Sequence, residues 1–303
     1  MVTTGALLHG EQTDLLDFND CEHPVALQLG GNDPAAMAEC AAMAEALGYD
    51  EVNINVGCPS DRVQKGAFGA CLMREPQLVA ACVKAMQAVC SIPVTVKTRT
   101  GIVLKDAPDE YSNLDFLFRL VDTLVESGCQ RLYLHARVAV LEGLSPAQNR
   151  DIPPLTPEKG EAIKLRHPDL ELILNGGITH LANALAPMTW ADGIMIGRAA
   201  YHRPRFLSEL EQNLYDTDFR IDESAIFDRY VAYMSTQLNQ GVKLNILTKH
   251  LLHCFSGKPG ARRYRQILSD SKRLNANDFD LVYEAHSALG LHTGQTEVGL
   301  NAG

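Results

Sequence analysis

The chain has 303 residues and a formal net charge of −10 at neutral pH, with 46% hydrophobic and 21% charged residues. This is the composition of an ordinary soluble globular protein, and the length suits one large domain with a smaller one attached. No apolar run approaches the roughly 18 residues that a membrane span needs, and the N-terminus lacks the basic start and apolar core of a secretory signal. We therefore expect a cytoplasmic protein with no membrane partner.

Short β-rich runs alternate with longer helical patterns up to about residue 200. Seven strands are predicted, at 1–7, 24–30, 51–57, 92–99, 131–137, 171–177 and 192–198. Between them lie stretches rich in Ala, Met, Leu and Glu, such as 34–48 and 75–90, which favour helices. Apolar strands that alternate with helices indicate βα units and a parallel sheet.

Polar or reactive residues recur where these strands end, among them Gln28, Asn55, Cys58, Lys97, His135, Arg137, Asn175 and Arg198. A (β/α)8 barrel builds its active site at that face, whereas an open doubly wound sheet places ligands at one switch point. The pattern therefore favours a TIM barrel. A closed barrel needs eight strands, so the count of seven predicts that the first barrel strand is missing from this chain.

Helical periodicity replaces the strands after about residue 205, at 203–215, 223–241 and 243–255. We predict a catalytic barrel domain over 1–205 and a small all-helical domain over 206–303. Between Lys243 and Arg273 the chain carries eight Lys and Arg residues against a single acid, Asp270. A basic block in an acidic protein indicates either a solvated helix face or a nucleic-acid interface.

None of the eight cysteines forms a C-x-x-C pair, which disfavours a zinc ribbon or a thioredoxin-like motif, and we expect no metal site. Cys40, Cys82 and Cys90 lie among alanines and valines, as buried small hydrophobes do. Cys58 differs, because it stands between Gly57 and Pro59 at a strand end. It could pack, bind a metal or do chemistry.

Two glycine-containing strand ends, "ILNGGI" (173–178) and "GIMIGRAA" (193–200), follow each other as the last two strands of a barrel would. Loops in that position often bind phosphate through backbone N–H groups, and Arg198 could add a charged contact; tight turns are the alternative. Lys97 is either a surface strand-end lysine or a cation that stabilises a reduced cofactor. Gln28 offers a donor and an acceptor for an imide edge, and His135 is either a core or a functional histidine.

Several long segments together resemble the flavin-dependent tRNA-dihydrouridine synthases, most closely the A-type branch. They are "VNINVGCPSDRVQKGAFGACLM" (52–73), "VTVKTRTGI" (94–102), "LHAR" (134–137), "GLSPAQNRDIPPL" (143–155), "NGGI" (175–178) and "MIGRAAYHRP" (195–204). The similarity extends over essentially the whole chain, as far as "GKPGARRYRQILS" (257–269). One departure is the initial strand of the family, with an "APM"-like motif, whose equivalent would precede Met1.

The resemblance implies an FMN-binding barrel and a helical domain that together grip tRNA. It implies reduction of the C5–C6 bond of D-loop uridines U20 and U20a to 5,6-dihydrouridine with FMN and NADPH, and we expect a monomer. FMN contacts are assigned to Gln28, Lys97, His135, Asn175, Gly176, Gly177, Gly197 and Arg198. Cys58 is assigned as the catalytic acid, and tRNA contacts go to Asn55, Arg137, Asn149, Arg150, Arg262 and Arg265.

The chemistry agrees with this assignment, because hydride delivery to C6 leaves enolate charge that a proton donor must quench at C5. A thiol with a pKa of about 8.5 is mostly protonated near neutral pH and gives up its proton readily. Two alternatives stay open: an FMN barrel that acts on a free pyrimidine, and a non-catalytic tRNA-binding fragment. The basic block disfavours the first, and Cys58, Lys97 and His135 disfavour the second.

Overall fold

The computed structural model describes residues 1–10, 13–60, 64, 66–107 and 109–290. The chain divides into two compact units, Met1–Ile196 and Gly197–Gly303. The predicted boundary after residue 205 therefore falls inside the second unit. The functions that we assigned to the two domains stay predictions.

The first unit is built on a parallel sheet of seven strands, as the sequence predicted. Its order is β1 (Val2–Thr3), β2 (Ala26–Gly30), β3 (Glu51–Val56), β4 (Val94–Arg99), β6 (Arg131–His135), β8 (Glu171–Asn175) and β9 (Gly193–Met195). Every neighbouring pair is parallel, and β1 and β9 stand at the two ends of this order. A separate pair, β5 (Ile102–Val103) and β7 (Ala139–Val140), joins the segments that follow β4 and β6.

The first predicted strand is much shorter than expected. Only Val2 and Thr3 are extended, and the chain then enters helix α1 (Thr4–His9). The Thr3 hydroxyl accepts a hydrogen bond from the Ala6 N–H at 3.3 Å. This N-cap ends the strand, because a capping residue satisfies one of the N–H groups that a helix start leaves without a partner.

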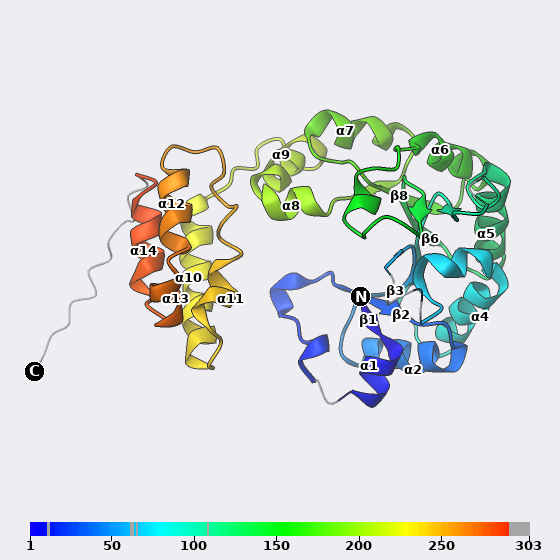
Figure 1. Ribbon diagram of the computed structural model, residues 1–303, viewed down its shortest axis with the longest axis horizontal. Coiled ribbons are helices and arrows are strands. Elements are labelled where there is room, and N and C mark those ends of the chain that lie inside the picture. The colour runs from blue at the N-terminus through cyan, green and yellow to red at the C-terminus, as the bar shows by residue number, and fades with distance from the viewer. Residues whose placement is uncertain (11–12, 61–63, 65, 108, 291–303) are drawn as a thin grey trace, which may run out of the picture. The chain divides into compact units, whose positions relative to one another are not determined.

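Helices follow the strands in the expected alternation (Figure 1). They are α2 (Pro34–Ala46), α4 (Pro76–Gln87), α5 (Leu114–Glu126), α6 (Pro157–Arg166) and α7 (Leu181–Leu185), with 3₁₀ turns η1 (Thr13–Leu16), η2 (Asp20–Glu22), η3 (Gly69–Arg74), η4 (Gln148–Arg150) and η5 (Ala186–Thr189). Proline at the first turn and an Asp33 cap start α2, and Asn113 caps α5. The helices predicted at 34–48 and 75–90 are confirmed.

Alternate residues of each strand serve two different faces of the sheet. Val52, Ile54 and Val56 of β3 are fully buried in one apolar cluster with residues of α2 and α4, such as Met37 and Val83. Complete burial of such side chains contributes about 1.5–3 kcal/mol each. The intervening β3 residues, Glu51, Asn53 and Asn55, therefore point to the opposite face, which we call the inner face.

The second unit is helical. It comprises α8 (Arg198–His202), α9 (Arg205–Leu214), α10 (Glu223–Asn239), α11 (Leu244–Thr248), α12 (Ala261–Leu268), α13 (Ser271–Asn275) and α14 (Asp280–Ser287). Phe227, Met234, Tyr264 and Leu281 belong to its buried core. Of the predicted helices, 203–215 and 223–241 form, whereas 243–255 is helical only in α11. None of the helices in the described ranges is long and apolar enough to cross a membrane.

Candidate functional site

The strand register brings four of the predicted residues together on the inner face as two neighbouring pairs. Asn55 of β3 pairs with Lys97 of β4, while His135 of β6 pairs with Asn175 of β8. Gln28 of β2 reaches this row by accepting a hydrogen bond from Asn55 Nδ2 at 2.9 Å. Five neighbouring strands therefore place these side chains together, as in the active-site face of a barrel.

Cys58 is held in place by Asn55, three residues before it. Asn55 Oδ1 accepts hydrogen bonds from the backbone N–H groups of Gly57 at 3.1 Å and Cys58 at 3.0 Å. The Cys58 thiol is half-buried and lies 3.5 Å from the Ser60 hydroxyl, within hydrogen-bond range for sulfur. The side chain of the strand end thus fixes the backbone that carries the thiol.

The other cysteines behave differently. Cys40 and Cys82 are buried as predicted, and burial raises the pKa of each thiol to about 11. Burial does the same to Cys129. Cys90 is half-buried, and its thiol donates to the Met86 carbonyl oxygen. These thiols are poor proton donors, and their role is to pack in the protein interior.

Lys97 is a cation in a largely buried position. Its Nζ donates to Asn175 Oδ1 at 3.3 Å, and Asn175 Nδ2 donates to the Met195 carbonyl oxygen at 2.7 Å. Burial, and after it the charge of Arg99, lowers the pKa of Lys97 to about 8. A desolvated amine of this kind is available to an anion or to an electron-rich ring.

Gly176 and Gly177 form the turn that follows β8, with φ angles of +111° and +69°. A Cβ on Gly176 would lie 2.6 Å from His135 Cδ2, and one on Gly177 would lie 2.5 Å from Leu155 Cδ1. The imidazole of His135 is buried against this turn. A cavity of about 250 Å³ is lined by both glycines and by Leu155 and Trp190. Any side chain at the two glycines would collide with the residues around it.

Arg99 is the residue whose role the sequence analysis left undefined. It is buried, and its guanidinium donates to the carbonyl oxygens of Gly57, Val138 and Asn149 at 3.0, 3.0 and 2.8 Å. Burial lowers its pKa to about 10. Arg99 therefore ties the Gly57–Cys58 backbone to the segments that follow β6.

Arg137 adds another positive charge to this end of the sheet. Its Nη1 donates to the Pro153 carbonyl oxygen, and its buried Nε has no hydrogen-bond partner in the part of the chain that the structure describes. Among the same residues, no carboxylate forms an ion pair with Lys97, Arg99 or Arg137. This edge of the sheet is therefore electropositive within an acidic protein.

The predicted RNA-contacting loop residues Asn149 and Arg150 are placed differently from each other. Asn149 is completely buried, and its amide bonds to the backbone of Val140, Leu144 and Ser145. This placement is at odds with a direct contact of Asn149 to RNA, because its polar atoms are already used to hold the loop. Arg150 is exposed at the end of η4.

Gly197 and Arg198 open the second unit, and both are exposed. Gly197 precedes the short helix α8, which begins at Arg198. Among the residues that the structure describes, none has an atom within 4 Å of a Cβ built on Gly197. Their assigned contact with a phosphate stays a prediction.

The basic block is less uniform than its sequence suggested. Arg262 and Arg265 are exposed on α12, three residues apart and so on one face of that helix. Lys258 instead pairs with Glu223, and Arg273 pairs with Asp278 and Glu284. These carboxylates lie outside the block in sequence. Part of the block therefore stabilises the helical unit, and Arg262 and Arg265 stay available for an anionic partner.

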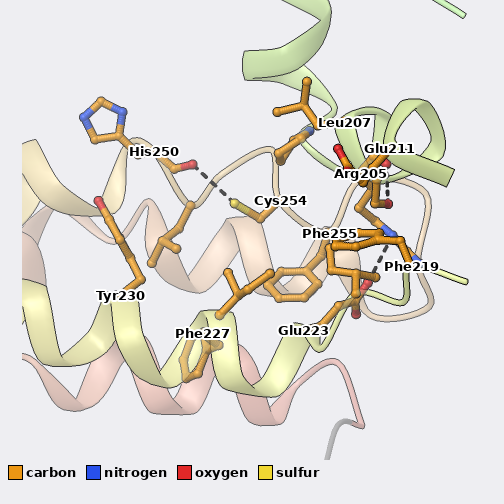
Figure 2. A pocket seen from close by; sticks show the side chains of 15 residues that line it. Arg205, Leu207, Glu211, Phe219, Glu223, Phe227, Tyr230, His250, Cys254 and Phe255 are labelled. Carbon is orange, nitrogen blue, oxygen red and sulfur yellow. Dashed lines mark hydrogen bonds and ion pairs between the residues drawn. The ribbon is translucent and has the colours of Figure 1, made fainter. Parts of the chain in front are cut away.

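A cavity of about 460 Å³ lies within the helical unit (Figure 2). Its lining is mostly apolar, with Phe227 and Phe255 among the side chains. Glu223 pairs with Arg205 at 3.0 Å, and the Cys254 thiol donates to the His250 carbonyl oxygen at 3.5 Å. None of the predicted site residues lines this cavity.

Comparison with known proteins identifies close relatives. The family model described as "Dihydrouridine synthase (Dus)" matches residues 1–288. A protein of Shewanella oneidensis named "tRNA-dihydrouridine(20/20a) synthase" is 46% identical over 290 residues, which cover 95% of this chain and 84% of the relative. Proteins with the same name from Escherichia coli K12 and Pseudomonas syringae pv. tomato are 47% and 49% identical, covering 94% and 96% of this chain and 81% and 85% of their own lengths.

Proposed function

The chain belongs to the dihydrouridine synthase family, and on that premise we propose that it reduces the C5–C6 bond of uridines 20 and 20a in tRNA, using FMN and NADPH. The relatives named as tRNA-dihydrouridine(20/20a) synthases support the substrate and the positions. The observation that carries the assignment is that Asn55, which pairs with Lys97 in the register of β3 and β4, also holds the backbone of Cys58.

The residues at the inner edge suit an anionic flavin. Lys97 and Arg137 bring positive charge that no described carboxylate neutralises, and the buried Arg137 Nε has no hydrogen-bond partner among the described residues. We propose that the cofactor is held by Gln28, Lys97, His135, Asn175, Gly176, Gly177, Gly197 and Arg198. FMN, when bound, would take up a hydride from NADPH and pass it to the uracil ring. Lys97 then stabilises negative charge that develops beside it.

Cys58 serves as the proton donor in this proposal. Its backbone is fixed by Asn55 on one side and by Arg99, through the Gly57 carbonyl oxygen, on the other. A half-buried thiol can reach a substrate base, whereas the thiols of Cys40 and Cys82 cannot. Asn55 lies next to Cys58 and could contact the same base. A uridine must leave its stack to reach this site, which costs about a few kcal/mol and least where pairing is weak.

We propose that the exposed Arg262 and Arg265, with Arg137 and Arg150, bind the tRNA backbone. Exposed arginines on one helix face suit phosphates, which supply most of the affinity for nucleic acids. A free pyrimidine would require none of them. For that reason tRNA is a better substrate candidate than a free base.

The test uses the full chain with FMN and NADPH on tRNA that lacks dihydrouridine. Mass spectrometry of the digested tRNA should show the gain of two hydrogens at positions 20 and 20a, and free uridine should remain unchanged. Reduction of free uridine at the same rate would favour the dehydrogenase alternative. Binding of tRNA without reduction, in a protein that retains FMN, would favour the non-catalytic alternative.

A further inference from the structure

A buried carboxylate stands at the start of β3, at the opposite end of that strand from Asn55. Glu51 Oε2 accepts hydrogen bonds from Arg131 Nη1 at 2.7 Å and from the Tyr133 hydroxyl at 3.0 Å. Its other oxygen, Oε1, accepts a hydrogen bond from the Thr95 hydroxyl at 2.6 Å. The proposed site and its reaction use none of these residues.

An unbroken series of side-chain hydrogen bonds runs from this carboxylate to Cys58. Thr95 Oγ1 accepts from Asn53 Nδ2 at 2.8 Å, and Asn53 Oδ1 accepts from Gln28 Nε2 at 2.7 Å. Gln28 Oε1 accepts from Asn55 Nδ2 at 2.9 Å, and Asn55 Oδ1 accepts from the Cys58 N–H at 3.0 Å. We call this series the inner-face chain.

The direction of every bond in the inner-face chain follows from its charged end. A carboxylate paired with an arginine only accepts, so the single hydroxyl proton of Thr95 must point to Glu51. Thr95 can then only accept from Asn53, which fixes the orientation of that amide. Each amide fixes the next in the same way, until the oxygen of Asn55 faces the backbone of Cys58. The backbone N–H groups at the far end also only donate, so the two ends agree.

We propose that Glu51 is a positioning residue for the proposed active site: its carboxylate sets the orientation of the Gln28 and Asn55 amides, and through Asn55 it holds the Cys58 backbone. The inference rests on the proposed function in so far as Gln28 and Cys58 act there. The same series also explains why Asn53 and Thr95 are buried polar residues on the inner face. Buried polar networks are worth most when every member is satisfied.

Replacement of Glu51 by glutamine reverses the order of donors and acceptors. Arg131 offers only donors, so the amide oxygen of the new side chain must face Arg131 and its NH₂ must face Thr95. Thr95 could accept from both amides, but its own proton would then lack the acceptor that Glu51 provided. We therefore expect Thr95 to donate to Asn53 instead of accepting from it, so that the amides of Asn53, Gln28 and Asn55 turn over in sequence. The NH₂ of Asn55 would meet the N–H groups of Gly57 and Cys58, so that two donors face each other.

The experiment compares Glu51→Gln with Glu171→Gln in the FMN-loaded protein. Glu171 is the matched control, because it pairs with the same arginine, Arg131 Nε at 2.8 Å, but takes no part in the inner-face chain. Protein labelled with ¹⁵N-cysteine gives the hydrogen-exchange rate of the Cys58 amide, whose resonance is assigned by its loss in Cys58→Ser. Anaerobic mixing with NADPH and then with tRNA gives the rates of the two half-reactions.

In Glu51→Gln we expect Cys58 amide exchange to rise about 5–10-fold, because one hydrogen bond is lost. The rate of tRNA reduction should fall about 10²-fold, as displacement of a catalytic group by about 1 Å can cause. Reduction of the flavin by NADPH should change much less. Glu171→Gln should leave all three values near those of the parent protein. Equal Cys58 exchange in the two variants would overturn the proposal.

A second pair of variants guards against a folding defect in Glu51→Gln. Thr95→Ser keeps the hydroxyl that links Glu51 to Asn53 and so sets the direction of the hydrogen bonds that follow. Thr95→Val removes this hydroxyl with little change of volume. Faster Cys58 exchange in the valine variant alone supports the inner-face chain, and equal exchange in both contradicts it. If the parent protein itself failed to reduce tRNA, the proposed function would fall, and the Cys58 exchange comparison would still decide the role of Glu51.

Discussion

The oxygen of the Asn55 side chain accepts a hydrogen bond from the backbone N–H of Cys58 at 3.0 Å, so the last inward-facing residue of β3 holds the backbone of the proposed catalytic thiol. This contact turns a strand end into a fixed platform for a proton donor. It also makes the geometry of Cys58 depend on one amide group that can be altered without touching the thiol.

Replacement of Asn55 by alanine should therefore slow tRNA reduction while FMN is retained. The substitution removes the acceptor for two backbone N–H groups, and we expect a loss of about 10²-fold in the rate of flavin reoxidation by tRNA. Asn55→Asp is the matched control for the loop, because a carboxylate still accepts from the Cys58 N–H. Its Cys58 amide exchange should resemble that of the parent. Unchanged exchange in Asn55→Ala would show that the loop does not need this contact.

Lys97 should make the cofactor-free protein less stable below pH 8 than above it. Burial lowers its pKa from 10.5 to about 8, so the unfolded chain binds more protons than the folded chain between those values. Stability therefore rises with pH from about 8 to 10.5 on account of this group. Lys97→Met should raise the free energy of unfolding at pH 7 by roughly 1–3 kcal/mol, and the gain should shrink by pH 10. Urea unfolding at both pH values measures the difference; a gain independent of pH would contradict the burial of a charged amine.

Gly176→Ala should destabilise the β8 turn and lower FMN occupancy. A methyl group there would press on the His135 ring at 2.6 Å, at a residue with φ of +111°. Gly143→Ala is the control, because Gly143 has a similarly positive φ of +85°, but a Cβ built there would have no atom of a described residue within 4 Å. Both variants should lose about 1 kcal/mol of stability from backbone strain. Only Gly176→Ala should also lose bound flavin, as measured by the visible spectrum. Equal flavin content in the two variants would show that the turn after β8 is not part of the cofactor site.

Arg262→Ala with Arg265→Ala should weaken tRNA binding and reduce its salt dependence. Each lost phosphate contact lowers the slope of log K against log salt by about one. Lys84→Ala, which removes an exposed cation from α4, controls for a general charge effect and should leave the slope almost unchanged. FMN content should be the same in all three proteins. If the slope of log K against log salt is unaltered in the double variant, the two arginines do not contact phosphates and only form a solvated helix face.

The strand ends were predictable because period-two alternation and glycine-rich turns are local signals. Lys97, His135 and Asn175 lie where that alternation put them, on the inner face and in adjacent strands. The same alternation in "EVNINV" could have revealed Glu51 and Asn53 as inward-facing polar residues. Their hydrogen-bond partners could not be found in this way, because hydrogen bonds between strands depend on the strand register, which alternation within one strand does not reveal.

Particular side-chain hydrogen bonds and ion pairs account for the remaining differences. Asn149 was predicted to touch RNA, but the loop folds back on it and uses its amide completely. Lys258 and Arg273 were counted in the basic block, but they are paired with acids that lie up to 35 residues away in sequence. Neither the periodicity of a segment nor its count of charges shows which side chains pair. The strand predicted at 1–7 is extended only at Val2–Thr3, because the Thr3 hydroxyl caps helix α1, which begins at the next residue.

The most direct test of the account is anaerobic reoxidation of the NADPH-reduced protein by tRNA that lacks dihydrouridine. In the parent protein the flavin spectrum should return to its oxidised form as dihydrouridine appears at positions 20 and 20a. In Cys58→Ala the flavin should bind and be reduced normally, but reoxidation by tRNA should slow about 10²–10⁴-fold, the usual contribution of a general acid. Cys71→Ala, a change at another half-buried thiol, should behave as the parent does. Reoxidation of Cys58→Ala at the parental rate would contradict the assignment of Cys58 as the proton donor, and an absence of dihydrouridine in the parent reaction would contradict the proposed function itself.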